Sequence, residues 1–452
     1  MKRVRNKRTA LLLALFGLPA WAMAQPGDSV RTTKHEFSIA QAVDYAKKNN
    51  VNVKNALLDV QIQEQVNREV TANAYPQINA SGSYTYNAKL PVSLVPAEFF
   101  GGPPGTFQKI EFGLKHNMTG GLELNQILFD GQVFVGLQAR KAVMEFSQKN
   151  VEVTEEMIKA NIYKIYYQLV VSKRQIELLD ANIGRFEKLL HDTREIYKAG
   201  FAEQLDIDKV SVGLTNLQTE KIKAQNMINN GYYALKVLMG MPVKDELVLT
   251  DELKDSDIKE GMLDAMSYKY DDRKEYQYAE LGIKLNEYNI KRWKLSKIPT
   301  LNLNAYYNEN AQRDKFNFFG GTWFGISAIS LRLNVPIFNG FATNSRIQKA
   351  KLVLQQSQNT RESLKLSIDN EVETAKSNFR SAVAALDFQK KNMDLAEKIY
   401  QQTKKKYEMG TGSQTEINTA QTDLKAAQTN YITALYDAII ARVDFLKATG
   451  KL

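Results

Sequence analysis

The sequence predicts a mainly helical fold that also carries amphipathic β-strands and is built twice within one chain. From residue 341 to 409 there is no Gly or Pro, the residues that most often interrupt helices. A helix of that length would extend about 100 Å, farther than a globular domain is wide. A second long helical pattern precedes it by 210 positions. Each half also contains two stretches in which apolar and polar residues alternate, as in half-buried strands.

Residues 1–24 have the organisation of a secretory signal peptide. Five basic residues precede an apolar stretch from residue 10 to 18, and Ala22-Met23-Ala24 matches a small-x-small cleavage site. An uncleaved anchor is the alternative, but the apolar stretch is too short to span a bilayer. Cleavage lowers the net charge from +10 to +5. This excess is too weak and dispersed to predict a nucleic-acid partner.

The sequence contains no pattern typical of catalysis or cofactor binding. The absence of cysteine excludes disulfides and thiolate metal sites. The three histidines, His35, His116 and His191, are far apart and form no ligand pair. No phosphate-binding Gly-rich loop, nucleophile elbow or paired-carboxylate motif occurs. We therefore expect a protein that is not an enzyme and needs no cofactor or metal. After the signal peptide no apolar run is long enough for a transmembrane helix, so a membrane role would require β-strands.

The first predicted repeat covers residues 25–240. Residues 25–36 are expected to form an unstructured lead, and Ser38 is a suitable N-cap for a short helix. Alternating residues from 78 to 86 and from 111 to 125 predict two strands around a loop at 88–110 that is rich in Gly and Pro. The predicted elements are helices at 38–49 and 52–74, a β-hairpin over 77–126, a long helix over 133–199 and a helix over 203–239.

The second predicted repeat covers residues 273–452, after an inter-repeat segment at 241–272. That segment contains a short apolar strand at 247–249 and a short helix near 261–268. The last strand of the repeat changes its apolar phase after Ala328, which predicts a bulge or a change of environment along the strand. The predicted elements are a helix at 273–297, a β-hairpin over 300–336 with its loop at 309–322, a long helix over 341–409 and a helix over 414–449.

The two long helices share one apolar seam with a 3.5-residue period, as in a left-handed coiled coil. Ile158, Leu169 and Leu190 of the first helix correspond to Ile368, Phe379 and Tyr400 of the second, and twelve successive seam positions match in this way. The match indicates an internal duplication. Each long helix should fold back on its successor at Gly200 or Gly410. The medium helix of each half has the length needed to stack end to end on that shorter successor.

Four strands of roughly 10–14 residues suit a tilted crossing of a bilayer. Four strands cannot close a barrel, and an open edge is not tolerated in lipid, so several chains would have to pool their strands. The strands could instead form a soluble β cap. The alternative class of function is a secreted coiled-coil structural or adhesive envelope protein. A periplasmic adaptor is a further alternative, although no segment resembles its lipoyl-like β domain.

Four short motifs at repeat spacing carry a resemblance to a known family. They are Ala74-Tyr75-Pro76-Gln77-Ile78, Leu128-Phe129-Asp130-Gly131, Pro336-Ile337-Phe338-Asn339-Gly340 and Tyr407-Glu408-Met409-Gly410-Thr411-Gly412-Ser413. With these motifs the mature chain resembles the TolC-type outer-membrane efflux proteins. The resemblance implies a homotrimer with a 12-stranded β-barrel in the outer membrane of a Gram-negative bacterium, joined to a 12-helix periplasmic α-barrel. Loops 88–110 and 309–322 would be extracellular.

The resemblance also implies a function and partners. The protein would be a channel that exports small molecules or polypeptides, as the exit duct of a tripartite efflux or type I secretion system. Its partners would be a periplasmic adaptor (a membrane fusion protein), an inner-membrane pump and outer-membrane lipid. The two helical turns would form the periplasmic tip that contacts the adaptor. Their residues here are Lys198, Ala199, Gly200 and Phe201, and Glu408, Met409, Gly410 and Thr411.

An acidic residue stands six positions after each turn glycine, at Asp206 and Glu416. In a trimer these residues would bring six carboxylates to one constriction, which would make the pore prefer cations. We therefore predict that Asp206 and Glu416 form the periplasmic gate. The alternative is that both are helix-start acids stabilised by the helix dipole.

Overall fold

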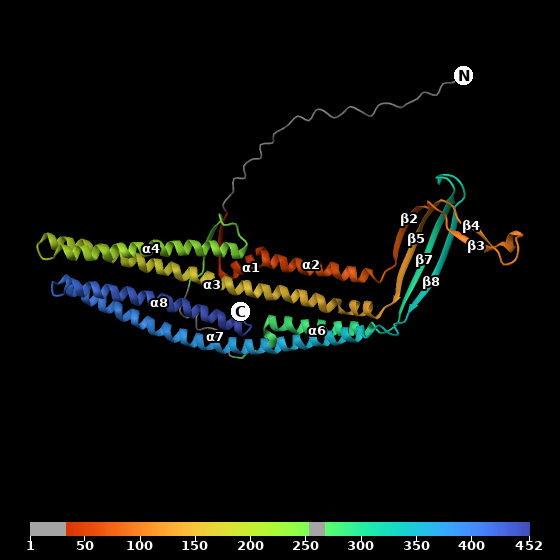
Figure 1. Cartoon of the computed structure of the whole chain (residues 1–452). Helices are drawn as coiled ribbons and strands as arrows, with labels where there is room; N and C mark the ends of the chain where they lie inside the picture. Colours follow the sequence, from red (N-terminus) through yellow and green to blue (C-terminus); the bar gives the residue numbers. More distant parts are fainter. Residues whose placement is uncertain (1–32, 253–266) are drawn as a thin grey trace, which may run out of the picture.

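The computed structural model describes residues 33–252 and 267–452. The predicted signal peptide lies outside the described residues, as does most of the predicted helix at 261–268. The molecule is an elongated body of long helices with a four-stranded sheet at one end, and the two helical turns lie at the other end (Figure 1).

The first half begins with a short strand and ends with two long helices. Its elements are β1 (Lys34–Phe37), α1 (Ile39–Asn49), α2 (Val51–Ala72), β2 (Gln77–Tyr86), β3 (Val92–Pro96), the 3-10 helix η1 (Ala97–Phe100), β4 (Phe107–Glu111), β5 (His116–Phe129), α3 (Gly131–Lys198) and α4 (Gln204–Met239).

The second half repeats this order of a medium helix, two strands and two long helices. Its elements are β6 (Glu246–Leu249), the 3-10 helix η3 (Tyr270–Asp272), α6 (Lys274–Leu295), β7 (Thr300–Arg313), β8 (Phe324–Asn334), α7 (Ala342–Glu408) and α8 (Gln414–Ala448). The helix bounds in both halves lie within two residues of the predicted ones. The division into repeats at 25–240 and 273–452 stays a prediction.

Two predictions about the first half are wrong. Residues 34–36 belong to strand β1 and not to an unstructured lead, because β1 pairs in parallel with β6, with His35 opposite Leu247. The predicted loop at 88–110 contains a hairpin of its own, in which Val92 of β3 pairs with Glu111 of β4. Residue 111 therefore belongs to this added hairpin, and the second long strand begins only at His116.

The predicted bulge in the last strand is absent. The register of β7 and β8 is continuous from Thr300 opposite Asn334 to Asn310 opposite Phe324. The alternative, a change of environment along the strand, stays a prediction. A register shift does occur on β5, between Ile127 and Phe129, where β5 leads into α3.

The helices form a wall that is four helices wide along its whole length. Next to the sheet the order across the wall is α2, α3, α6 and α7, and beyond the middle it is α4, α3, α8 and α7 (Figure 1). The long helices α3 and α7 run through both halves of the wall. The medium helices α2 and α6 continue end to end into α4 and α8, as the helix lengths predict.

The strand order β2-β5-β7-β8 follows the helix order, because each strand is joined directly to one helix of the wall. The strands are antiparallel, and residues paired across them share one face. One face carries apolar rows such as Ile78, Leu124, Ala305 and Ile329. The other carries polar rows such as Gln77, Asn125, Asn304 and Ser330. The sheet is therefore amphipathic.

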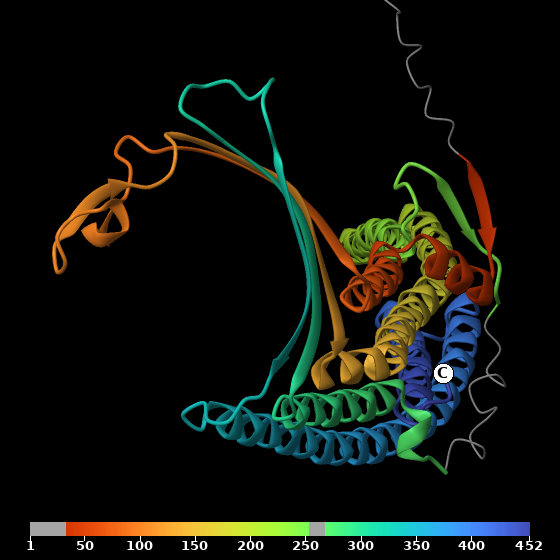
Figure 2. The same ribbon diagram turned by 90° about the vertical axis from the view of Figure 1, so that its right-hand side faces the viewer.

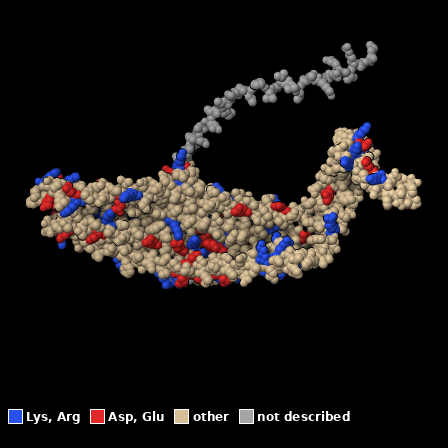
Figure 3. All heavy atoms as spheres, viewed as in Figure 1, with Lys and Arg blue, Asp and Glu red and all other residues tan. Residues whose placement is uncertain are grey.

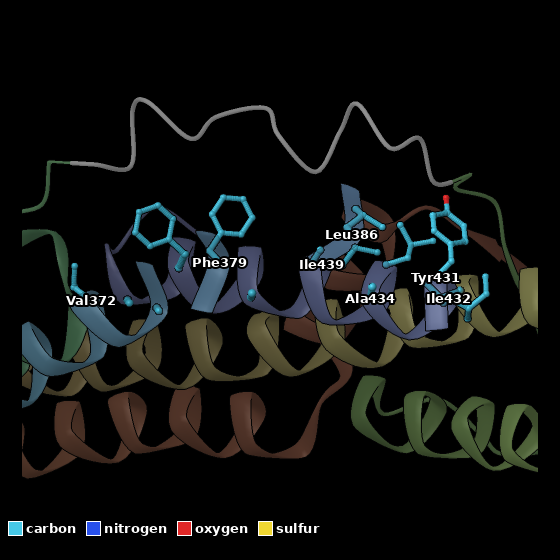
Figure 4. Packing of buried hydrophobic residues seen from close by; sticks show 14 of the residues in the cluster. Val372, Phe379, Leu386, Tyr431, Ile432, Ala434 and Ile439 are labelled. Carbon is cyan, nitrogen blue, oxygen red and sulfur yellow. The ribbon is translucent and has the colours of Figure 1, made fainter. Parts of the chain in front are cut away.

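The seam of the long helices forms the core of the wall. In the second half Ile368, Val372, Phe379 and Leu386 are buried against α8 (Figure 4). The Phe379 and Phe445 rings stack with their centroids 5.9 Å apart. In the first half Ile158, Ile162, Leu169 and Leu190 occupy the corresponding buried positions. The coiled-coil seam predicted from the sequence is confirmed as the packing surface.

Candidate functional site

The two helical turns have nearly the same backbone geometry. Gly200 after α3 has φ = 82° and Gly410 after α7 has φ = 75°, the left-handed region that favours glycine. The Phe201 N–H donates to the Ile196 carbonyl at 3.0 Å, and the Thr411 N–H donates to the Lys406 carbonyl at 3.0 Å. These bonds satisfy carbonyl groups at the helix ends that would otherwise lack a partner. The glycines therefore set the sharp reversal of both turns.

The outermost side chains of the turns are apolar and exposed. Phe201 is 86 % exposed and Met409 is 70 % exposed. Lys198 is next to the first turn and pairs with Glu195 at 2.7 Å. Glu408 approaches Lys404 to 3.8 Å beside the second turn. Each turn thus presents a large apolar side chain beside charged ones, which suits a contact surface for another protein.

Asp206 and Glu416 lie in the first turns of α4 and α8. The Glu203 N–H donates to Asp206 Oδ2 at 3.2 Å, and the Ser413 N–H donates to Glu416 Oε2 at 3.3 Å. Ser413 Oγ accepts from the Glu416 N–H at 3.2 Å, which completes a capping box. Both acids therefore stabilise a helix start, as the alternative interpretation expects. Their contribution to a ring of carboxylates in a pore stays a prediction.

A polar contact joins the helices just behind the turns. The Tyr407 hydroxyl donates to Gln414 Oε1, and the buried Thr193 hydroxyl lies 3.5 Å from the same oxygen. Burial raises the pKa of Tyr407, so its hydroxyl stays protonated at neutral pH. The sequence placed Tyr407 in the apolar seam and at the start of the fourth family motif, and predicted no polar contact for it. The contact joins α3, α7 and α8, and no sequence spacing identifies partners on three helices.

Two further contacts tie the two helical hairpins together. The buried Asn182 Nδ2 of α3 donates to the buried Gln428 Oε1 of α8 at 2.8 Å. The Arg185 guanidinium of α3 lies 3.4 Å from Glu397 Oε2 and 5.4 Å from the centre of the Tyr400 ring, both on α7. Apart from Tyr400, which belongs to the predicted seam, sequence reasoning missed these residues. The only available signal was the presence of amide side chains beside apolar seam positions.

Residues 33–252 and 267–452 contain no group of three or more His, Cys, Asp or Glu side chains placed to hold a metal ion. Within the same residues, every helix is either too short or too polar to cross a membrane.

The family model for outer membrane efflux proteins matches residues 42–241 and 272–451. The chain belongs to the outer membrane efflux protein family. This efflux protein is 20 % identical to the outer membrane protein TolC of Vibrio cholerae over 337 residues, covering 74 % of this chain and 77 % of the relative. The family membership overrides the interpretation as a secreted coiled-coil structural or adhesive protein.

The fold is that of solved outer-membrane channels. One solved structure is that of CusC, which undergoes conformational changes on transmembrane channel formation. It superposes with a TM-score of 0.73 at 17 % identity, covering 96 % of this chain and 95 % of CusC. The outer membrane protein VceC from Vibrio cholerae superposes with a TM-score of 0.70 at 15 % identity, covering 91 % and 96 %. The efflux protein is therefore an outer-membrane channel with a large periplasmic part.

Proposed function

We propose that this efflux protein forms a homotrimeric duct through the outer membrane. The duct accepts small molecules or polypeptides from an inner-membrane pump through a periplasmic adaptor. The two helical turns form its periplasmic tip, where the duct is gated and the adaptor binds. Loops 88–110 and 309–322 lie on the extracellular side.

The open edges of the chain carry this proposal. Among the described residues, the edge strands β2 and β8 of the large sheet have a strand neighbour on one side only. Unpaired edges are not tolerated in lipid. Pairing β8 of one copy with β2 of the next closes the sheet, and three copies supply twelve strands. The order of helices matches the order of strands, so the same operation also closes the helical wall.

The edges of the helical wall support the same assembly. Helices α2 and α4 lie along one edge and α7 along the other (Figure 1). Both edges carry exposed apolar side chains: Leu58 and Ile62 of α2, Ile222 and Met227 of α4, and Leu352, Leu366 and Leu395 of α7. Contact between neighbouring copies would remove these side chains from water, at about 25 cal/mol per Å² of apolar surface.

The apolar face of the sheet supports contact with outer-membrane lipid. Ile78, Ile329, Leu331 and Leu333 are exposed on this face. In a closed barrel the apolar face would meet lipid, and the polar face with Asn125, Asn304 and Ser330 would line the lumen.

Native mass spectrometry of the detergent-purified mature chain tests the assembly. We expect a mass of three chains, and a monomer would refute the proposal. A second measurement follows single-channel currents in planar bilayers, where the trimer should conduct without a pump because passage is passive. Crosslinking from a cysteine placed at Phe201 or Met409 should then capture the adaptor, since the chain contains no other cysteine.

The gate prediction is tested by neutralising both tip acids. The double variant D206N/E416Q should lower the preference for cations in bilayer recordings, because a ring of carboxylates holds cations. The control is E64Q on α2, which lies away from the turns. The exposed carboxylate of Glu64 pairs with Arg68 at a distance of 2.6 Å. Unchanged selectivity and conductance in the double variant would leave Asp206 and Glu416 with the capping role alone.

A further inference from the structure

The added hairpin β3–β4 forms a two-stranded sheet of its own and projects from the strand end of the molecule (Figure 1). It continues a paired stalk, because the Asn87 N–H donates to the Lys115 carbonyl at 2.8 Å and the Phe112 N–H donates to the Pro91 carbonyl at 3.0 Å. Figure 1 shows the hairpin beyond the ends of the long strands, on the side away from the helices. It is therefore a structured extension rather than a plain connecting loop.

The tip of this hairpin is held by its own hydrogen bonds. Glu98 Oε1 accepts from the Gly105 N–H at 2.9 Å, and the Ala97 N–H donates to the Thr106 carbonyl at 2.8 Å. Thr106 Oγ1 donates to the Pro103 carbonyl at 2.8 Å. These bonds define the position of η1, which carries Phe99 and Phe100. The two aromatic rings are thus presented in one arrangement.

The tip and its strands expose several apolar side chains. Phe99 is 78 % exposed, and Phe100, Phe107, Leu94 and Val92 are exposed as well. Such a cluster is unfavourable in water and is typical of a surface that another protein covers. In the loop between β7 and β8, Phe316 contacts Tyr84 edge to face and Arg313 donates to the Thr322 carbonyl at 2.8 Å, while Phe319 is fully exposed.

The direction of the hairpin identifies what covers it. Viewed from the strand end, β3 and β4 stand on the hollow side of the curved sheet (Figure 2). If the sheet is one third of a closed barrel, as the proposed function requires, the hollow side faces the barrel axis. In that assembly the corresponding hairpins of the other two copies converge on the same position.

The hairpin is long enough to reach the axis. Twelve strands about 4.8 Å apart and tilted by about 40° enclose a circle with a radius of about 12 Å. Each strand of the hairpin contains five residues, about 16 Å of extended chain. We propose that the three β3–β4 hairpins meet over the extracellular mouth and close it with an aromatic cluster of Phe99 and Phe100. This inference rests on the proposed trimer.

A single cysteine tests the contact in this cysteine-free chain. The variant F99C, treated as a detergent-solubilised trimer with a short bis-maleimide, should give crosslinked pairs of chains. The control is F319C, because Phe319 is fully exposed but lies on the loop between β7 and β8, outside the hairpin. F319C should not crosslink. A trimer in which F99C also fails to crosslink would overturn the inference.

Conductance tests whether the contact closes the mouth. The variant F99A/F100A removes both rings from an exposed tip and should raise the single-channel conductance by about twofold or more, since an apolar constriction limits flow by excluding water. A trimer with unchanged conductance would overturn the closure. Quenching of a tryptophan in F99W by brominated lipid would also overturn it, because the tip would then lie on the membrane. A chain that is monomeric by native mass spectrometry would refute the proposed function instead.

Discussion

Helix α2 continues into α4 and helix α6 continues into α8. These two helix junctions have the same geometry but different chemistry. At the first junction, Asn50 Nδ2 donates to the Leu238 carbonyl of α4 at 2.6 Å. At the second, Arg273 Nη1 donates to the Ala448 carbonyl of α8 at 2.9 Å. Asn50 and Arg273 each precede the first residue of their medium helix. In both cases a side chain at a helix start satisfies a carbonyl group at the end of another helix.

The difference between the junctions lies in their other contacts. Asn50 also accepts from the Asn52 N–H at 2.8 Å and so caps its own helix. Arg273 instead bonds Glu371 Oε2 at 3.0 Å and Glu275 Oε2 at 3.3 Å, with only 4 % of its side chain exposed. The fold therefore requires a donor at this position but not a particular residue. The first junction is neutral and local, and the second is charged and ties α6 to α7.

The largest expected effect comes from replacing the glycine at a junction, Gly240 at the first and Gly450 at the second. Gly240 has φ = 72° and Gly450 has φ = 71°. A Cβ on Gly240 would overlap the backbone oxygen of Asn49, and a Cβ on Gly450 would lie 2.7 Å from the backbone oxygen of Asp272. G240A should destabilise the protein by about 3 kcal/mol through backbone strain and overpacking. Thermal unfolding in detergent measures this loss.

G450A should have a smaller effect than G240A, because a Cβ on Gly450 would approach the Asp272 oxygen less closely than a Cβ on Gly240 would approach the Asn49 oxygen. A suitable control is G184A, since a Cβ on Gly184 meets no atom within 4 Å. G184A should be neutral or stabilising, because alanine favours a helix interior more than glycine does. Equal stability of G240A and the unmodified protein would show that the junctions are not closely packed.

The next largest effect comes from removing the side chains that donate across the junctions, Arg273 and Asn50. R273A should lower stability by about 2 kcal/mol, because it removes charge-assisted bonds from a buried position. N50A should lower it by about 1 kcal/mol, the usual effect of losing an N-cap. Chemical denaturation of both variants in detergent measures the difference.

The swap R273N sharpens the comparison of the donors. Asparagine can cap α6 as Asn50 caps α2, so R273N should retain more stability than R273A. If R273N and R273A were equally unstable, the ion pairs with Glu371 and Glu275 would be the main contribution of Arg273.

A smaller effect is expected at the tip turns. S413A removes the hydroxyl that accepts from the Glu416 N–H and should cost about 1 kcal/mol. Because the terminal turn of α8 is exposed, hydrogen exchange of the first amides of α8 is a more sensitive measurement than global unfolding. T415A is the control, since Thr415 lies in the same turn and α8 is capped by Ser413. Equal exchange in S413A and T415A would contradict the capping role.

The smallest expected effect is a pH dependence of stability at the second, charged junction, which contains Arg273. Burial raises the pKa of Glu156 on α3, and the nearby Glu275 raises it further. Because the folded-state pKa lies above the ordinary value of 4.5, the unfolded chain releases this proton first as pH rises. Glu156 therefore lowers stability as pH rises from that ordinary value through its raised pKa. E156Q should remove this part of the pH dependence.

Thermal unfolding of E156Q at about pH 4 and about pH 7 measures the effect. E156Q should be slightly more stable than the unmodified protein at the higher pH, because a buried oxygen of Glu156 has no hydrogen-bond partner. The control is E155Q, whose carboxylate forms an ion pair with Lys47 at 3.2 Å. An identical pH dependence in E156Q and the unmodified protein would contradict the prediction.

Much of the fold follows from local patterns in the sequence. The seam that includes Leu169 and Phe379 predicts both long helices, because a 3.5-residue apolar period has one packing solution. Gly200 and Gly410 predict the turns, because a left-handed residue favours glycine. The β3–β4 hairpin escaped prediction, since its strands are only five residues long and flank the stretch 101–105, which consists of Gly and Pro. β1 escaped because its partner, β6, lies more than two hundred residues away.

The sequence by itself determined the duplicated helices, the amphipathic strands and the positions of both tip turns, because each depends on residues close together in the chain. Only the tertiary structure decided which donors close the helix junctions, as Arg273 and the Ala448 carbonyl are 175 positions apart. It also decided that Asn182 meets Gln428, 246 positions away. Contacts between distant segments depend on how whole helices pack, and no local spacing encodes them.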